Sequence, residues 1–221
     1  MFKKSQMVIV LVLLSLLIAV GMLRGSNRRG QKQHQSGQPG VFDYYVLALS
    51  WSPEFCHGHP SSPECVSGRY GFVVHGLWPQ KEDGYTENCS TAPGPSDPSQ
   101  MTDIMPDPSL VQHEWTTHGT CSGLDADAYF KLVRQAFASV KIPAQLTAPQ
   151  KMLSIPPQEL KEQFVAANPQ LKPEDLAVSC GNNYLTGVNV CLDKQLQPRA
   201  CAGLSDCRAN GIKVPPVRGA Q

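Results

Sequence analysis

The sequence predicts an α+β fold, in which a central, mainly antiparallel β-sheet packs with several helices in a single, disulfide-stapled domain. Segments with strand-like composition lie toward both ends of the globular part of the chain, and segments with helical periodicity cluster between them. The regular alternation of strand and helix that is typical of a doubly wound sheet is absent. Eight cysteines, all after residue 55, indicate that disulfides hold the domain together.

The first half of the domain is predicted to contain two strands and a long loop. Residues 42–52 are aromatic and β-branched, and they partly alternate between apolar and polar. Residues 70–77 form a second strand, which Gly76 and the Trp78-Pro79 pair are expected to end. His75 would then sit at a strand end. Residues 81–105 are rich in Pro, Gly, Ser and Asp and predict a loop.

The second half is predicted to contain three helices and a further strand. The first helix spans 108–117, with Asp107 as N-cap and Pro108 at the first helical position. Residues 125–140 and 157–167 show apolar residues at helical spacing. Residues 184–192 alternate well enough for a strand.

The N-terminus is typical of a targeting segment. Lys3 and Lys4 precede seventeen mainly apolar residues, 7–23, so residues 1–24 predict a signal peptide or signal anchor. Ala19 and Gly21 favour cleavage, but a run of this length also reaches the lower limit for spanning a bilayer. Membrane attachment is expected only if the segment stays uncleaved. In either case the domain is extracytoplasmic, either periplasmic or secreted.

Residues 25–40 are polar and Gly-containing, and they predict a flexible linker before a domain at 41–215. Six of the 19 basic residues and none of the 18 acidic ones lie in the first 38 residues, which leaves a net charge of −5 for the rest. A mildly acidic domain does not suit tight, nonspecific binding of nucleic acid. A polyanionic substrate would have to be held by a local site.

The eight cysteines predict four disulfides because their number is even and the domain is exported. Spacing alone leaves all 105 pairings open. A zinc site is disfavoured because no C-x-x-C pair exists.

Two short segments, 72–80 (FVVHGLWPQ) and 113–121 (HEWTTHGTC), carry the candidate chemistry. They supply imidazoles on separate elements, with no nucleophilic Ser or Cys tied to them, which suits a reaction that needs one base and one acid. His113 and His118 are five residues apart and lie about 140° apart around a helix, so they do not easily share a zinc ion. Glu114 and His118 are four apart and share a helical face. A zinc hydrolase and histidines with only a core-packing role remain the alternatives.

With these residues the chain resembles the ribonuclease T2 family of metal-independent endoribonucleases. The two segments above carry the resemblance, together with 44–56 (YYVLALSWSPEFC), Cys89, Cys121 and 184–194 (YLTGVNVCLDK), and it covers most of residues 42–210. It implies that single-stranded RNA is cleaved to a 2′,3′-cyclic phosphate and then a 3′-phosphate, without cofactor or metal. DNA would not react because it lacks the 2′-OH.

The resemblance implies a role for each candidate residue. His118 is the base and His75 the acid, with the catalytic Glu114 and the substrate-binding His113 supporting the phosphate. Trp78, Trp115 and Tyr70 are candidates for stacking on bases, although core packing is the alternative for the tryptophans. The implied disulfides are Cys89–Cys121, Cys180–Cys207 and Cys191–Cys201, with Cys56–Cys65 as the remainder.

Thr117 is the one departure from the family pattern, which usually has a lysine just before the second catalytic histidine. A threonine beside the substrate brings a hydroxyl but no charge, so transition-state stabilisation by a few kcal/mol would be lost unless another cation, such as Lys81, replaces it. This motivates an alternative: a binding protein or regulator with little catalysis. RNA is the only partner predicted, and the protein is expected to be a monomer. Asn88 lies in a glycosylation sequon.

Overall fold

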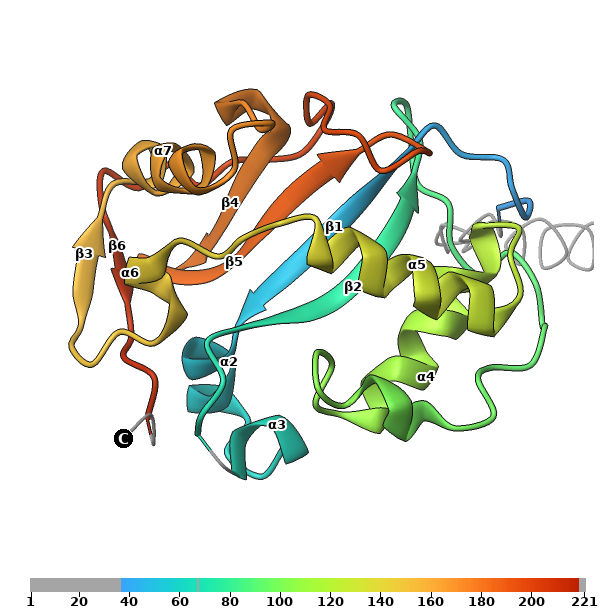
Figure 1. Cartoon of the computed structure of the whole chain (residues 1–221), viewed down its shortest axis with the longest axis horizontal. Helices are drawn as coiled ribbons and strands as arrows, with labels where there is room; N and C mark the ends of the chain where they lie inside the picture. Colours follow the sequence, from blue (N-terminus) through green and yellow to red (C-terminus); the bar gives the residue numbers. More distant parts are fainter. Residues whose placement is uncertain (1–36, 67, 219–221) are drawn as a thin grey trace, which may run out of the picture. The chain divides into compact units, whose positions relative to one another are not determined.

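The computed structural model describes residues 37–66 and 68–218, which form an α+β domain built around one sheet (Figure 1). Within these residues the strands are β1 (Tyr44–Trp51), β2 (Phe72–Gln80), β3 (Leu153–Ile155), β4 (Leu176–Gly181), β5 (Tyr184–Leu192) and β6 (Ile212–Val214). Their order is β2-β1-β5-β6-β3, with β4 also paired to β5. The pairings are antiparallel except for β5 with β6, which is parallel. The predicted fold class is confirmed.

The helices are α2 (Ser52–Gly58), α3 (Pro63–Val66), α4 (Pro108–Thr117), α5 (Ala126–Ala138), α6 (Ala144–Thr147) and α7 (Pro157–Ala167). Short 3-10 turns lie at Pro98–Met101, Gly119–Cys121 and Pro173–Asp175. Figure 1 shows α5 crossing beside β1 and β2 with α4 next to it, while α7 lies by β4. The short helices α2 and α3 fill the connection from β1 to β2.

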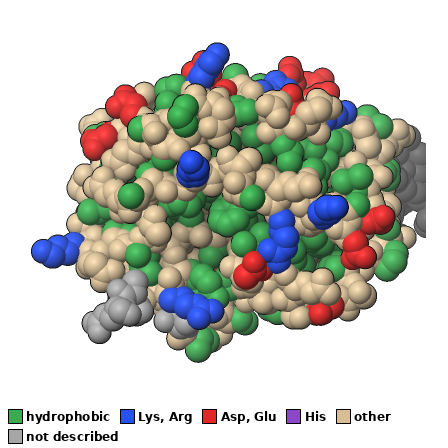
Figure 2. Space-filling model, in the orientation of Figure 1, with side chains coloured by type: hydrophobic (Ala, Val, Ile, Leu, Met, Phe, Trp, Pro, Cys, Tyr) green, Lys and Arg blue, Asp and Glu red, His purple; other side chains and the backbone are tan. Residues whose placement is uncertain are grey.

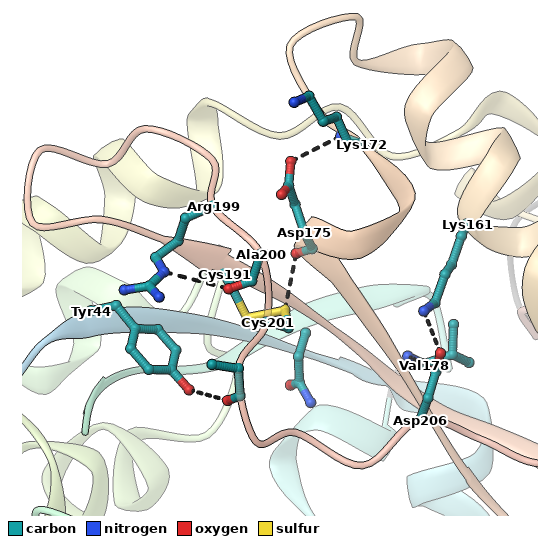
Figure 3. Close-up of a disulfide and its surroundings, with 12 residues drawn as sticks. Tyr44, Lys161, Lys172, Asp175, Val178, Cys191, Arg199, Ala200, Cys201 and Asp206 are labelled. Carbon is teal, nitrogen blue, oxygen red and sulfur yellow. Dashed lines mark hydrogen bonds and ion pairs between the residues drawn. A yellow bond between two sulfur atoms is a disulfide. The ribbon is translucent and has the colours of Figure 1, made fainter. Parts of the chain in front are cut away.

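The main core lies between the sheet and the helices. Its largest buried side chains include Trp51 of β1, Trp115 of α4, Tyr129 of α5 and Phe164 of α7. A smaller cluster around Tyr44, Val46 and Cys191 is closed by the Cys191–Cys201 disulfide (Figure 3). There the Tyr44 hydroxyl donates to the Ala202 carbonyl at 2.8 Å, which ties the C-terminal segment to β1.

All the predicted strands and helices are confirmed, with shifts of a few residues at their ends. β2 is the exception that matters, since it continues past Gly76 and Trp78 to Gln80. Several elements were not predicted from the sequence. They are α2, α3, α6, β3, β4 and β6. Except for α2 and β4, each of these elements is only three or four residues long.

The predicted targeting segment, 1–24, lies outside the described residues, as does most of the predicted linker. The last residues of that linker belong to the fold: the Gly37 N–H donates to the Glu87 carbonyl at 3.0 Å and the Gly40 N–H to the Cys121 carbonyl at 2.9 Å. Among residues 37–66 and 68–218, none of the helices has the length and apolar character needed to cross a bilayer.

Charged side chains are dispersed on the surface that can be seen. On the face drawn in Figure 2, Lys and Arg side chains are scattered among Asp and Glu and do not gather into one basic patch. This agrees with the expectation that a polyanion would be held by a local site on this protein, because a broad basic surface is what nonspecific binding needs.

Candidate active site

His75 lies in the middle of β2 at a β-bulge, and the prediction that it sits at a strand end is wrong. Val74 and Gly76 pair with consecutive residues of β1, so His75 has no partner across the ladder. A bulge of this kind bends the strand and changes the direction of one side chain. The half-exposed His75 ring reaches back to β1, where its Nδ1 is 3.1 Å from Ser50 Oγ.

Helix α4 supplies the other two central groups. The Asp107 side chain accepts from the Ser109 N–H at 2.8 Å and caps the helix start, as predicted. Glu114, one turn before the helix end, is buried with only 1% of its surface exposed. His118 caps the C-terminus, and its backbone N–H donates to the Glu114 carbonyl at 2.9 Å.

The Glu114 carboxylate is held by β2. Its Oε2 accepts from Trp78 Nε1 at 2.7 Å, and its Oε1 lies 3.3 Å from His75 Nε2. Gly76 makes this approach possible, because a Cβ at that position would lie 2.0 Å from Glu114 Oε2 and 2.4 Å from Trp78 Nε1. The glycine after His75 is therefore required by the carboxylate.

The two histidines are shifted in opposite directions. Burial by itself would lower the pKa of His75, but the hydrogen bond and charge of Glu114, with the charge of Glu64, raise it above its ordinary value. Burial lowers the pKa of His118, and the charges of Glu114 and Glu87 offset this only in part. Near neutral pH, His75 is thus biased toward imidazolium and His118 toward neutral imidazole.

Trp78 contacts both imidazoles. Its ring centroid is 5.5 Å from that of His75 and 5.2 Å from that of His118. Nδ1 of His118 is buried and has no hydrogen-bond partner among the described residues. Protonation of the ring would leave a charged N–H without an acceptor, which is a second reason for His118 to stay neutral.

His75 opens into a pocket of about 260 Å³ that His113 also lines. His113 is exposed on α4, and Ser50, Asp107 and Leu110 complete much of the wall. His118 does not line this pocket; it is linked to His75 through Trp78 and Glu114. The structure therefore brings His113 and His75 to one pocket, while His118 contacts the other residues of the site through Trp78.

The predicted aromatic residues lie in three different places. Trp115 is buried in the core, with 1% of its surface exposed, and its Nε1 donates to the Ala92 carbonyl at 2.9 Å. Trp115 therefore packs in the core and is not placed to stack on a base. Trp78 is half-buried, and its indole N–H donates to the Glu114 carboxylate. Tyr70 lines a second pocket, of about 590 Å³, which does not include His75.

Thr117 is half-buried in the last turn of α4, next to His118. Its carbonyl accepts from the Asn88 N–H at 2.8 Å, which ties the loop after β2 to the end of the helix. Lys81 follows β2 directly and forms a β-bridge with Gly84; it lines neither pocket.

The four disulfides are Cys56–Cys65, Cys89–Cys121, Cys180–Cys207 and Cys191–Cys201, the pairs that the resemblance implies. Cys121 lies three residues after His118, so its bond to Cys89 restrains the segment that carries the histidine. Across the described part of the chain, no group of three or more His, Cys, Asp or Glu side chains is placed to hold a metal ion.

Three contributors to the site were not predicted from the sequence: Ser50, Gly76 and Glu64. The chain places Ser50 and Glu64 far from the two histidine segments, and only strand pairing and helix α3 bring them to His75. Gly76 carried a signal, since a glycine next to a candidate catalytic residue often marks a close approach.

An α+β fold that surrounds a buried carboxylate with two oppositely shifted imidazoles defines a site for general acid–base catalysis. The chain belongs to the Ribonuclease T2 family, whose sequence model matches residues 42–201. The predicted family is thereby confirmed.

Known relatives agree with this assignment. A ribonuclease of Aeromonas hydrophila is 39% identical over 112 residues, 50% of this chain and 52% of that protein. A probable ribonuclease of Haemophilus influenzae is 33% identical over 72% of this chain and 61% of its own length. These matches thus span about half to three-fifths of the relatives' length. A crystal structure of an RNase MC1 mutant with 5′-UMP has a TM-score of 0.59 and 25% identity, and covers 77% of this chain and 97% of that one.

Proposed function

We propose that this chain is an exported, metal-independent endoribonuclease that cleaves single-stranded RNA by transphosphorylation. The observation that carries the proposal is the pair of imidazoles with pKa values shifted apart around one buried carboxylate. Family membership and the ribonuclease relatives support the substrate class. The RNase MC1 structure holds 5′-UMP, which supports a nucleotide-binding site in this fold.

In the first step His118 removes the proton from the ribose 2′-OH. The resulting oxygen attacks the adjacent phosphorus, and the bond from phosphorus to the 5′ oxygen of the next nucleotide breaks. A base must be unprotonated, and the lowered pKa of His118 favours that state.

His75 gives a proton to the departing 5′ oxygen. The Glu114 carboxylate, 3.3 Å from His75 Nε2, raises the pKa of the ring and so favours its protonated form. The product is a 2′,3′-cyclic phosphate. Water then opens the ring to a 3′-phosphate with the two roles exchanged: His75, now neutral, activates the water, and His118 returns its proton to the 2′ oxygen.

His113 and Glu114 support the reacting phosphate. His113 lines the His75 pocket from the exposed side of α4 and can donate to phosphate oxygens. The nucleophile belongs to the RNA, so the protein contributes proton transfer and charge stabilisation. Each positioned acid or base accounts for about 10²–10⁴-fold in rate.

An extracytoplasmic location, periplasmic or secreted, fits the disulfides, because such bonds persist in oxidising compartments. All eight cysteines are paired in the structure. We expect the N-terminal segment, 1–24, to direct export, with residues 41–215 as a monomeric catalytic domain.

Cleavage of poly(U) in the presence of EDTA tests the proposal. We expect the wild type to degrade the polymer and His118→Ala to lose about 10²–10⁴-fold in rate while keeping a cooperative thermal transition. Intact RNA with the folded wild type would exclude the enzyme and favour the RNA-binding alternative that Thr117 motivates. Activity that EDTA abolishes and zinc restores would favour a zinc hydrolase.

A further inference from the structure

A second pocket, of about 590 Å³, lies beside the one that contains His75, and the proposed reaction does not use it. Its walls come from α2, from the segment just before β2, from the turn between β4 and β5, and from the C-terminal segment around Pro215 and Arg218. Its volume lies within the range of roughly 300–1,000 Å³ that is typical of small-molecule sites. The Cys56–Cys65 disulfide, which links α2 to α3, contributes both cysteines to this wall.

Glu64 of α3 joins the two pockets, because its side chain lines both. It is 4% exposed, and the Ser52 hydroxyl donates to its Oε1. A carboxylate oxygen at this position can accept from base amino groups.

Aromatic rings line the second pocket, and cations lie next to these rings. The Arg69 guanidinium lies 5.0 Å from the Tyr70 ring centroid, and the ammonium of Lys213 lies 5.2 Å from that of Tyr184. Both tyrosines line the pocket, as does Arg218. Rings for base stacking beside cations for phosphate are the combination that single-stranded nucleic-acid sites use.

We propose that this second pocket binds one nucleotide of the same RNA strand, one position beyond the two nucleotides that flank the cleaved phosphodiester, with its base on Tyr70 or Tyr184 and its phosphate near Arg218. The inference rests on the proposed function. Continuity through Glu64 favours RNA as the occupant, since a strand that leaves the His75 pocket on this side passes directly into the second one.

The test uses DNA oligonucleotides that carry a single ribonucleotide, so that only one bond can be cleaved. The shortest substrate has two nucleotides, and the series grows by one nucleotide on the 5′ or the 3′ side. kcat/KM is measured for the wild type, Tyr70→Ala and Tyr184→Ala. Tyr70→Phe keeps the ring, and Tyr85→Ala removes an exposed tyrosine that lines neither pocket.

We expect wild-type kcat/KM to rise roughly 5- to 150-fold when one side reaches the length that fills the pocket. Tyr70→Ala or Tyr184→Ala should lose most of this gain but cleave the shortest substrate like the wild type, while Tyr70→Phe and Tyr85→Ala keep it. A gain that survives both alanine variants, or the absence of any gain with length, would overturn the inference and leave the proposed function standing.

Failure to cleave any substrate would instead count against the proposed function. Binding at the second pocket is then measured by fluorescence anisotropy with a labelled all-deoxy oligonucleotide, because this measurement needs no catalysis. Weaker binding by Tyr70→Ala and Tyr184→Ala, but not by Tyr85→Ala, supports the subsite. Equal binding by all variants rejects it.

Discussion

Gly76→Ala is expected to disable the site without touching a histidine. The new Cβ would lie 2.0 Å from Glu114 Oε2 and 2.4 Å from Trp78 Nε1, whereas real Cβ atoms essentially never come within 3.0 Å of such atoms. The carboxylate or the indole must therefore move by about 1 Å or more, and a displacement of that size at a catalytic centre costs about 10²-fold in rate. Gly76 does not have a positive φ, so the backbone itself accepts alanine.

Stability should fall as well. If the Trp78–Glu114 hydrogen bond breaks, a buried carboxylate loses its donor, and the free energy of unfolding should drop by about 1–3 kcal/mol. The assays are kcat/KM on a dinucleotide substrate and denaturant unfolding. Gly84→Ala is the matched control, because a Cβ there meets no atom within 4 Å.

The reasoning would be refuted if Gly76→Ala kept kcat/KM within about threefold of the wild type while Gly84→Ala did the same. A structure of the variant with Glu114 and Trp78 unmoved would refute it independently. Loss of activity in both variants would show that the loss does not depend on the close approach of residue 76 to the carboxylate.

Three further predictions concern charge at the site. kcat/KM should be bell-shaped in pH, because it falls as the base His118 becomes protonated below its lowered pKa and falls again as the acid His75 loses its proton above its raised pKa; a profile that stays flat from roughly pH 4 to 8 would contradict the two roles. Glu64→Gln removes a negative charge that raises the pKa of His75 and should move the alkaline limb to lower pH, whereas an unmoved limb would show that this charge does not reach the ring. Thr117→Lys should raise kcat if the missing cation limits the reaction, and an unchanged or lower kcat would reject that explanation.

Local chemistry was sufficient to predict much of the fold. Asp107 and Pro108 mark the start of α4 through capping and proline geometry, which depend only on neighbouring residues. The alternation in residues 184–192 predicted β5, and helical spacing predicted α7 at the observed bounds. These signals are contained within one element, so no tertiary information was needed.

Features that depend on pairing could not be predicted in this way. The bulge at His75 exists only in register with β1, and β6 is a three-residue strand that pairs with β3 and a single residue of β5. Tertiary packing also determines whether an aromatic side chain is buried in the core or lines a pocket. Trp115 packs against Tyr129 at 5.8 Å between ring centroids. Tyr70 and Tyr184 line one pocket although they are far apart in the sequence.

The central claim is that His118 activates the 2′-OH of RNA while His75 protonates the departing 5′ oxygen. Its most direct measurement is the identity of the first product from a dinucleoside monophosphate in EDTA, followed by ³¹P NMR alongside the 2′-deoxy analogue. We expect a 2′,3′-cyclic phosphate to form before any 3′-phosphate, with the deoxy analogue left intact. A 5′-phosphate product, or cleavage of the deoxy analogue, would contradict the assignment of His118 and His75.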